Sequence, residues 1–263
     1  EPEKLKLGGE RKEVTVLFAD IRGFTALSEN FIDRPDELTR ILNELLTPLT
    51  DVIISHQGTI DKYMGDAIMA FWNAPLDVDK HADKAVLAAL DMQSALASLN
   101  ERLMGEGRIG QPLSLGVGIN TGTVLVGNLG SEQRFDYSCI GDTVNLASRI
   151  EGLTKQLGMS ILLGGETAKR ISVSHSMSIV LLDDVFVVGK QQPESIFGVI
   201  DRKPEWLSDH QLLWRKVKNT EWDAAQVLFD DLVANTSYPE PLKAVLSRRL
   251  ADKDSGATKM LSK

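Results

Sequence analysis

Two aspartates stand where acidic side chains can do chemistry together. Asp20 ends the apolar, strand-like run 14–19, and Asp66 lies in a Met-Gly-Asp turn within the hairpin pattern 59–72. Either aspartate alone is typical of a strand end or a turn. If the two strands are neighbours, both carboxylates lie at one end of a sheet and repel each other unless a cation separates them. The pair therefore predicts a site for a hard divalent cation, which prefers oxygen ligands.

Asn145 and Arg149 form a second pair of polar residues, four positions apart at the start of a helix predicted over 142–157. Side chains with this spacing point the same way. They lie about 100° around the helix from the apolar stripe of Leu146 and Ile150. Such a face is usually only solvated, but a helix packed on a core by that stripe also offers an amide and a guanidinium to a neighbouring ligand.

The elements that position these residues mix strand and helix patterns. Strands are predicted over 14–20, 58–72 as a hairpin, 113–121 and 123–128 around Asn120-Thr121-Gly122, 134–140, 160–163, 178–187 and 195–200. Helices are predicted from Pro35, with a kink or restart at Thr47-Pro48, and over 79–103, 142–157 and 166–171. These patterns predict a linker at 1–13, an α+β domain at 14–201, a helical appendage at 202–251 and a disordered tail at 252–263.

Composition narrows the class of protein. The chain has 263 residues, 43% of them hydrophobic, and a net charge of −8, which argues against nucleic acid as a partner. Its single cysteine, Cys139, rules out an internal disulfide and fits a reducing compartment. No apolar run reaches the about 18 residues of a membrane span. Because the chain begins without methionine, we expect a piece of a longer protein.

Four motifs, in this order, resemble those of class III adenylyl and guanylyl cyclases. FADIRGFT at 18–25 and KYMGDA at 62–67 surround the two aspartates. GINTG at 118–122 with VGN at 126–128, and IGDTVNLASR at 140–149, follow them. The resemblance covers most of 14–200 and looks most like bacterial multidomain cyclases. It implies a cytoplasmic catalytic domain in a membrane-associated full-length protein, downstream of a sensor or membrane region.

The resemblance implies a ferredoxin-like βαββαβ core of the palm type, with an antiparallel-rich sheet. It also implies a head-to-tail homodimer whose active sites are shared by the two subunits. Two divalent cations, Mg²⁺ or Mn²⁺, would be held by Asp20, Asp66 and the backbone carbonyl of Ile21. The partner subunit would contribute the substrate-facing residues, which are Lys62, Ser138, Asn145, Arg149 and Lys190.

The implied reaction converts ATP into cyclic AMP and pyrophosphate by attack of the ribose 3′-hydroxyl on the α-phosphorus. Two cations would lower the pKa of the hydroxyl and neutralise the phosphates. In this reading Asn145 orients the ribose and Arg149 stabilises charge on the α-phosphate. Lys190 would bind phosphate, although Val188 stands where the family usually carries arginine.

Lys62 and Ser138 occupy the two positions by which the family distinguishes adenine from guanine. Lysine at the first is the adenylyl cyclase residue, and serine at the second can accept from an exocyclic amine or donate to a ring nitrogen. A register slip by one residue would put Cys139 there instead, as in guanylyl cyclases. Strand alternation places Cys139 on the apolar face with Phe135 and Tyr137, which favours Ser138 and ATP. A guanylyl cyclase, a silent nucleotide-binding regulatory module and a plain interaction module remain alternatives.

Overall fold

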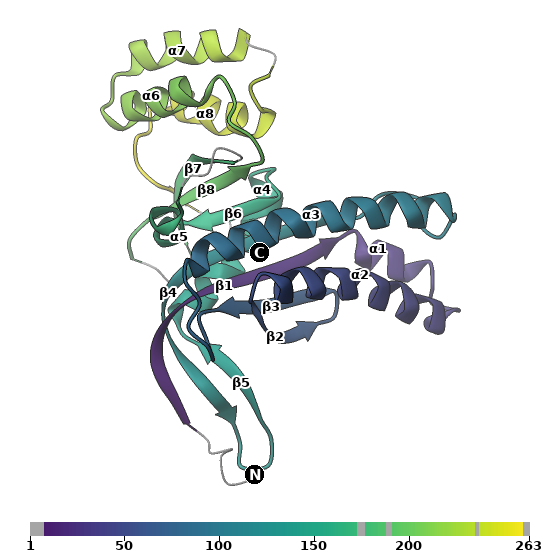
Figure 1. Cartoon of the computed structure of the whole chain (residues 1–263). Coiled ribbons are helices and arrows are strands. Elements are labelled where there is room, and N and C mark those ends of the chain that lie inside the picture. Colours follow the sequence, from purple (N-terminus) through teal and green to yellow (C-terminus); the bar gives the residue numbers. More distant parts are fainter. Residues whose placement is uncertain (1–7, 173–176, 188–190, 235–236, 260–263) are drawn as a thin grey trace.

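The computed structural model describes residues 8–172, 177–187, 191–234 and 237–259 (Figure 1). Its strands are β1 Gly8–Arg22, β2 Thr59–Met64, β3 Ala67–Trp72, β4 Ser114–Gly130, β5 Phe135–Ile140, β6 Ile161–Gly164, β7 Ser178–Phe186, β8 Glu194–Ile200 and β9 Thr258–Lys259. Its helices are α1 Phe24–Glu29, α2 Pro35–Ser55, α3 His81–Gly105, α4 Asp142–Gln156, α5 Gly165–Arg170, α6 Leu207–Lys218, α7 Trp222–Ala234 and α8 Glu240–Asp252.

A mixed sheet joins all of these strands. Its order is β2-β3-β1-β4-β6-β8-β7-β9, and β5 pairs with β4 beside this path. The pairs β4–β6 and β7–β9 are parallel, and the remaining pairs are antiparallel. The first half of the chain runs β1-α2-β2-β3-α3-β4 and gives the strand order β4-β1-β3-β2. The predicted α+β class with a ferredoxin-like βαββαβ core is therefore confirmed.

Helices α2 and α3 cover one face of this core (Figure 1). Apolar residues spaced three or four apart along α2, such as Ile41 and Leu45, pack with Leu17 and Ile21 of β1. On the other face, a smaller cluster joins β1, β3, β4, β5 and α4. It contains Val16, Phe71 and Cys139, so β5, which pairs with β4, contributes Cys139 to this smaller core.

The prediction of a linker over 1–13 is wrong for residues 8–13. These residues form the first part of β1, with Gly8 opposite Asn128 and Glu13 opposite Thr123 of β4. Their side chains are mostly exposed, so their composition is polar. The pairing is made by backbone hydrogen bonds, which do not depend on side-chain type. Figure 1 shows this part of β1 extending from the body together with β4 and β5.

Two predicted interruptions, the break between strands at Asn120-Thr121-Gly122 and a restart of the helix at Thr47-Pro48, are also wrong. The strands expected on either side of Asn120-Thr121-Gly122 are one strand, β4, in which Asn120 and Thr121 are buried and hydrogen-bonded. Polar residues there satisfy buried partners and make no turn. Helix α2 likewise continues through Pro48, because buried Leu45 and Leu49 hold both halves on the core.

Of the C-terminal helices, α6 and α8 lie next to β7, and α7 packs on α6 and α8 farther from the sheet (Figure 1). Trp206, Trp214 and Leu246 share a core with Leu162 of β6 and Val180 of β7. The predicted disorder of 252–263 is wrong for 252–259, where the chain turns back and β9 pairs with Val185 and Phe186 of β7. None of the helices in the described ranges combines the length and apolar character of a membrane span.

Candidate active site

Asp20 and Asp66 lie side by side at one end of the sheet. β1 and β3 pair in the register that puts Asp20 opposite Ala67, the residue after Asp66. The turn between β2 and β3 is made by Gly65, whose φ of 68° suits a residue without a side chain. Burial raises the pKa of the Asp66 carboxyl above its ordinary value, and the negative charge of Asp20 raises it further. The fold therefore brings two carboxylates close enough to repel each other.

This pair fits a divalent cation of the magnesium type. A bound cation would remove the repulsion that disfavours ionised Asp66. Among the described residues, no three histidine, cysteine or acidic side chains gather as a complete metal cage. Magnesium suits such a place, because it is commonly held by one or two carboxylates together with substrate phosphates. The side chain of Ile21 is a hydrocarbon without a ligand atom, so only its backbone carbonyl can serve as a ligand, and that role stays a prediction.

Lys62 and Ser138 meet at a residue that the sequence analysis missed. Ser138 Oγ donates a hydrogen bond to Asp61 Oδ2 at 2.6 Å, and Lys62 Nζ lies 3.1 Å from Asp61 Oδ1. The backbone N–H of Cys139 also donates to Asp61 Oδ2, at 3.3 Å. The Asp61 side chain is 0% exposed, whereas that of Lys62 is 46% exposed. The two residues expected to read the base thus share one buried carboxylate.

The register of β5 agrees with the predicted strand faces. Gly127 of β4 is opposite Ser138. Cys139 packs near Phe71 and Tyr137 in the smaller core, while Ile140 is exposed. Burial, and secondarily the charge of Asp61, raises the pKa of the Cys139 thiol to about 12. Cys139 is therefore a neutral core residue, and Ser138 is the residue of this pair that points toward Lys62 and its aspartate.

Asn145 and Arg149 lie on the first turns of α4, which packs unusually close to β4. A side-chain carbon added at Gly118 would lie 2.6 Å from the carbonyl oxygen of Ala147, closer than such atoms can approach. Asn120 Nδ2 donates to the carbonyl of Thr143 at 3.1 Å and fixes the start of the helix. Asn145 is exposed and Arg149 is half-buried. Gly118 and the buried amide of Asn120 thus fix the position of α4, which carries both polar residues.

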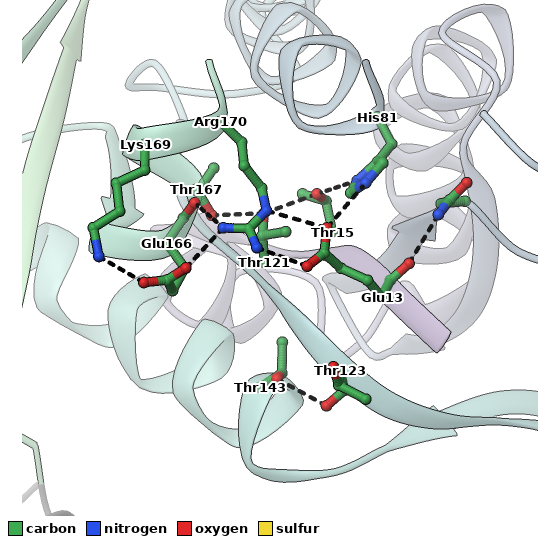
Figure 2. A network of polar contacts seen from close by, with 11 residues as sticks. Glu13, Thr15, His81, Thr121, Thr123, Thr143, Glu166, Thr167, Lys169 and Arg170 are labelled. Atoms are coloured by element: carbon green, nitrogen blue, oxygen red, sulfur yellow. Dashed lines mark hydrogen bonds and ion pairs between the residues drawn. The ribbon is translucent and has the colours of Figure 1, made fainter. Parts of the chain in front are cut away.

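A network of polar contacts fastens the neighbouring helices to β1 and β4 (Figure 2). Buried Thr121, next to Asn120, shares hydrogen bonds with Thr15 at 2.8 Å and Thr167 at 2.9 Å. Thr15 in turn contacts His81 Nδ1 at 2.7 Å, at the start of α3. Burial lowers the pKa of His81, so its ring is neutral near pH 7. This network fixes the position of β4, the strand on which α4 packs.

The structure thus brings together Asp20 with Asp66, and Lys62 with Ser138. Asn145 and Arg149 share the α4 face, as their spacing predicts. Lys190 lies outside the described residues. Asp61 could have been suspected only from its place beside Lys62, because its partner in β5 is 77 positions away.

Comparisons with known proteins agree with this fold and site. The family model described as "Adenylate and Guanylate cyclase catalytic domain" matches residues 9–198. An adenylate cyclase from Anabaena cylindrica is 43% identical over 201 residues, covering 75% of this chain and 39% of the relative. Adenylate cyclase 1 of Rhizobium meliloti is 39% identical over 155 residues, covering 59% of this chain and 23% of the relative. The matched part of the chain thus spans well under half the length of these relatives.

Solved cyclase structures are similar as well. The adenylyl cyclase CyaB from P. aeruginosa has a TM-score of 0.67 and 36% identity, covering 76% of this chain and 99% of that chain. The guanylyl cyclase Cya2 has a TM-score of 0.64 and also 36% identity, covering 76% of this chain and 98% of that chain. The chain therefore belongs to the class III adenylyl and guanylyl cyclase catalytic-domain family.

Proposed function

We propose that this chain is the catalytic part of an adenylyl cyclase. The observation that carries the proposal is the adjacent carboxylate pair, Asp20 and Asp66, at the end of a sheet of this family. Adenine is favoured because Lys62 lies against the same aspartate as Ser138, so that an ammonium and a hydroxyl stand together. The substrate is then ATP, and the products are 3′,5′-cyclic AMP and pyrophosphate.

In this reaction the ribose 3′-oxygen forms a new bond to the α-phosphorus. The bond from that phosphorus to its bridging oxygen breaks, pyrophosphate leaves with the electron pair, and the hydroxyl proton is released to water. Two divalent cations, when bound by Asp20, Asp66 and the Ile21 carbonyl, would acidify the hydroxyl and neutralise the triphosphate.

The side chains on α4 supply orientation and charge. The Asn145 amide is exposed and can hydrogen-bond a ribose, holding the 3′-oxygen in line with the phosphorus. The Arg149 guanidinium, one turn along the same face, presents a planar set of donors to a phosphate whose charge grows in the transition state. Lys190 is proposed as a further phosphate ligand.

We infer that the working unit is a head-to-tail homodimer. The carboxylate pair would come from one subunit, and Lys62, Ser138, Asn145, Arg149 and Lys190 from the other. Two exposed apolar residues, Leu125 and Ile140, pair in register just before α4. An exposed apolar surface beside a polar functional face is typical of a protein interface. The full-length protein is proposed to carry a sensor or membrane region before this cytoplasmic domain, because the relatives are much longer.

A guanylyl cyclase is the second candidate, because Cya2 is as similar in sequence as CyaB. The deciding experiment measures cyclic nucleotide formation from ATP and from GTP, with Mn²⁺ and then Mg²⁺, over a range of protein concentration. Cyclic AMP as the main product, with a specific activity that rises with concentration, is the expected result. Preferred formation of cyclic GMP would select the second candidate. Nucleotide binding without turnover by either substrate would instead indicate a regulatory module.

Mixing two inactive variants tests the shared site. Asp66→Asn removes a proposed cation ligand, and Asn145→Ala removes a substrate-facing residue of the partner subunit. An equal mixture should recover about a quarter of the wild-type activity, because half of the dimers are mixed and each has one intact site. Recovery no greater than the sum of the separate variants would contradict shared sites.

A further inference from the structure

We propose that Asp61 is a positioning residue that fixes the hydrogen-bond polarity of the base site, so that the site accepts a 6-aminopurine and rejects a 6-oxopurine. The inference rests on the proposed function, since it takes Lys62 and Ser138 as the residues that face the base. It concerns a residue that makes no contact with the nucleotide itself and acts through two neighbours.

The geometry begins with a buried carboxylate surrounded by donors. Asp61 is the unpaired residue where β2 shifts its register with β3, between Ile60 and Lys62, and its side chain is fully buried. Ser138 Oγ and the Cys139 backbone N–H both donate to Oδ2, at 2.6 and 3.3 Å. The ammonium of Lys62 lies 3.1 Å from Oδ1. An ionised carboxylate can only accept hydrogen bonds, and every one of these neighbours can donate.

The hydrogen bond to Asp61 decides whether the Ser138 hydroxyl donates to a ligand or accepts from it. A hydroxyl has one proton to donate and lone pairs that accept. The distance of 2.6 Å between Ser138 Oγ and Asp61 Oδ2 is that of a strong O–H···O⁻ bond, so the proton is directed to Asp61. Ser138 Oγ then has only lone pairs left for a ligand. A free serine can match either purine, whereas this serine can only accept.

Lys62 can only donate hydrogen bonds to a ligand, whereas Ser138 can only accept them. Its ammonium has three protons and no lone pair, and Asp61 engages only one side of it. Because its side chain is 46% exposed, the other protons remain available to a ligand. The two residues therefore present an acceptor beside a donor, both oriented by the same carboxylate.

Each purine presents one donor and one acceptor on this edge, so the match depends on which residue faces which position, and we take Ser138 to face the 6-position and Lys62 to face N1. Adenine carries a donor amine at its 6-position and an acceptor at ring N1, which complement Ser138 and Lys62. Guanine and hypoxanthine carry an acceptor oxygen at the 6-position and a proton on N1, so both contacts would oppose like groups. Opposing like hydrogen-bonding groups in this way is a source of discrimination.

The test replaces Asp61 by asparagine, which has the same shape but also donates hydrogen bonds. Its amide can donate to Ser138 Oγ and so release the serine proton toward a ligand. The probes are ATP and ITP, because inosine differs from adenosine only at the 6-position and the N1 proton. We expect the wild-type ratio of kcat/KM for ATP over ITP to fall at least about tenfold in Asp61→Asn. An unchanged ratio would overturn the inference.

A merely structural role makes a different prediction. If Asp61 only joins β2 to β5, Asp61→Asn lowers kcat for ATP and ITP equally and leaves their ratio intact. Asp136→Asn is the matched control, since Asp136 is on the same strand as Ser138 but is exposed. The Ser138→Ala variant gives a second test if Asp61→Asn does not fold. It removes the acceptor, so the ATP over ITP ratio must fall with Asp61 still present.

A double-mutant cycle tests whether Asp61 acts through Ser138. Asp61→Asn should change the ATP over ITP ratio much less when Ser138 is already alanine. Fully additive effects would contradict the mechanism.

Binding measurements separate failure of this inference from failure of the proposed function. The dissociation constants of 3′-deoxy-ATP and 3′-deoxy-ITP give the same ratio without any turnover, because these nucleotides lack the attacking hydroxyl. A wild-type protein that binds neither would overturn both proposals. Tighter binding of 3′-deoxy-ATP that Asp61→Asn leaves unchanged would overturn the role of Asp61 alone.

Discussion

Asp183 of β7 and Arg249 of α8 form a buried ion pair, with 1% and 3% of their side chains exposed. The guanidinium donates to Asp183 Oδ1 and also to the carbonyl of Gly256 in the turn after α8. Thr258 Oγ1 donates to the other carboxylate oxygen at 2.8 Å. A single acidic residue of the catalytic sheet therefore holds both the last helix and the short strand β9.

Arg249→Met should destabilise the fold by about 3–5 kcal/mol, because it leaves the Asp183 charge buried without its main partner. Urea unfolding measures this change in the free energy of unfolding. Arg248→Met is the matched control. Arg248 contacts the same carboxylate at 3.3 Å, but its side chain is 50% exposed, so its loss should cost less than about 1 kcal/mol. Equal costs for the two variants would show that burial of the pair is not what matters.

The order at 252–259 could not be predicted from composition, because it depends on this ion pair between residues 66 positions apart. The same reason explains residues 8–13, whose polar sequence reads as a linker although their backbone pairs with β4. By contrast, Asp20 and Asp66 were expected to lie close together on the condition that their strands are neighbours, and the pairing of β1 with β3 meets that condition. The hairpin that holds Asp66 in its turn is a local pattern, whereas the pairing that brings Asp20 beside it joins distant segments and could only be assumed.

Protonation of His210, in α6, should make the free energy of unfolding depend on pH. Its Nε2 lies 2.8 Å from the carbonyl oxygen of Leu181, so this nitrogen must carry the proton. Nδ1 is then the acceptor for the Tyr238 hydroxyl, at 2.6 Å. Both ring nitrogens are thus satisfied only in the neutral form. Burial lowers the pKa of His210 to about 4.

Because the pKa of His210 is lowered on folding, the unfolded chain binds the proton more strongly between its own pKa of about 6.5 and about 4. The contribution of His210 to stability is therefore full above about pH 6.5 and is lost as the pH falls. The loss should reach about 2 kcal/mol at pH 5 and about 3 kcal/mol below pH 4. Urea unfolding at pH 7.5 and pH 5 measures it.

In His210→Gln, which can donate to Leu181 and accept from Tyr238, the fall between these pH values should be smaller by about 2 kcal/mol. An identical pH dependence in this variant would contradict the assignment.

Asp66→Asn should lower cyclase turnover at least about 100-fold, since a loss of about 3 kcal/mol of charge stabilisation corresponds to two factors of ten. Without cation, the variant should unfold no more easily than the wild type, because removing one of two like charges relieves repulsion with Asp20. Thermal unfolding with and without Mn²⁺ tests both points. The midpoint should rise with Mn²⁺ for the wild type and for Asp51→Asn, an exposed control on α2, but not for Asp66→Asn. A cation-induced rise that survives in Asp66→Asn would remove Asp66 from the ligand set.

Gly118→Ala should reduce activity by moving α4 rather than by touching the substrate. The added methyl group would meet the backbone of Ala147 and Glu151, which cannot rotate away, so the helix must shift from β4. Overpacking of this kind costs about 1–3 kcal/mol of stability, and a displacement of about 1 Å at a reacting group can cost 100-fold in rate. Gly110→Ala is the control, because nothing lies within 4 Å of its added carbon. We expect Gly118→Ala to lower kcat far more than the fraction of folded protein, measured by circular dichroism at the assay temperature. If activity instead falls only in proportion to the folded fraction, the close contact between α4 and β4 serves stability and does not set the positions of Asn145 and Arg149.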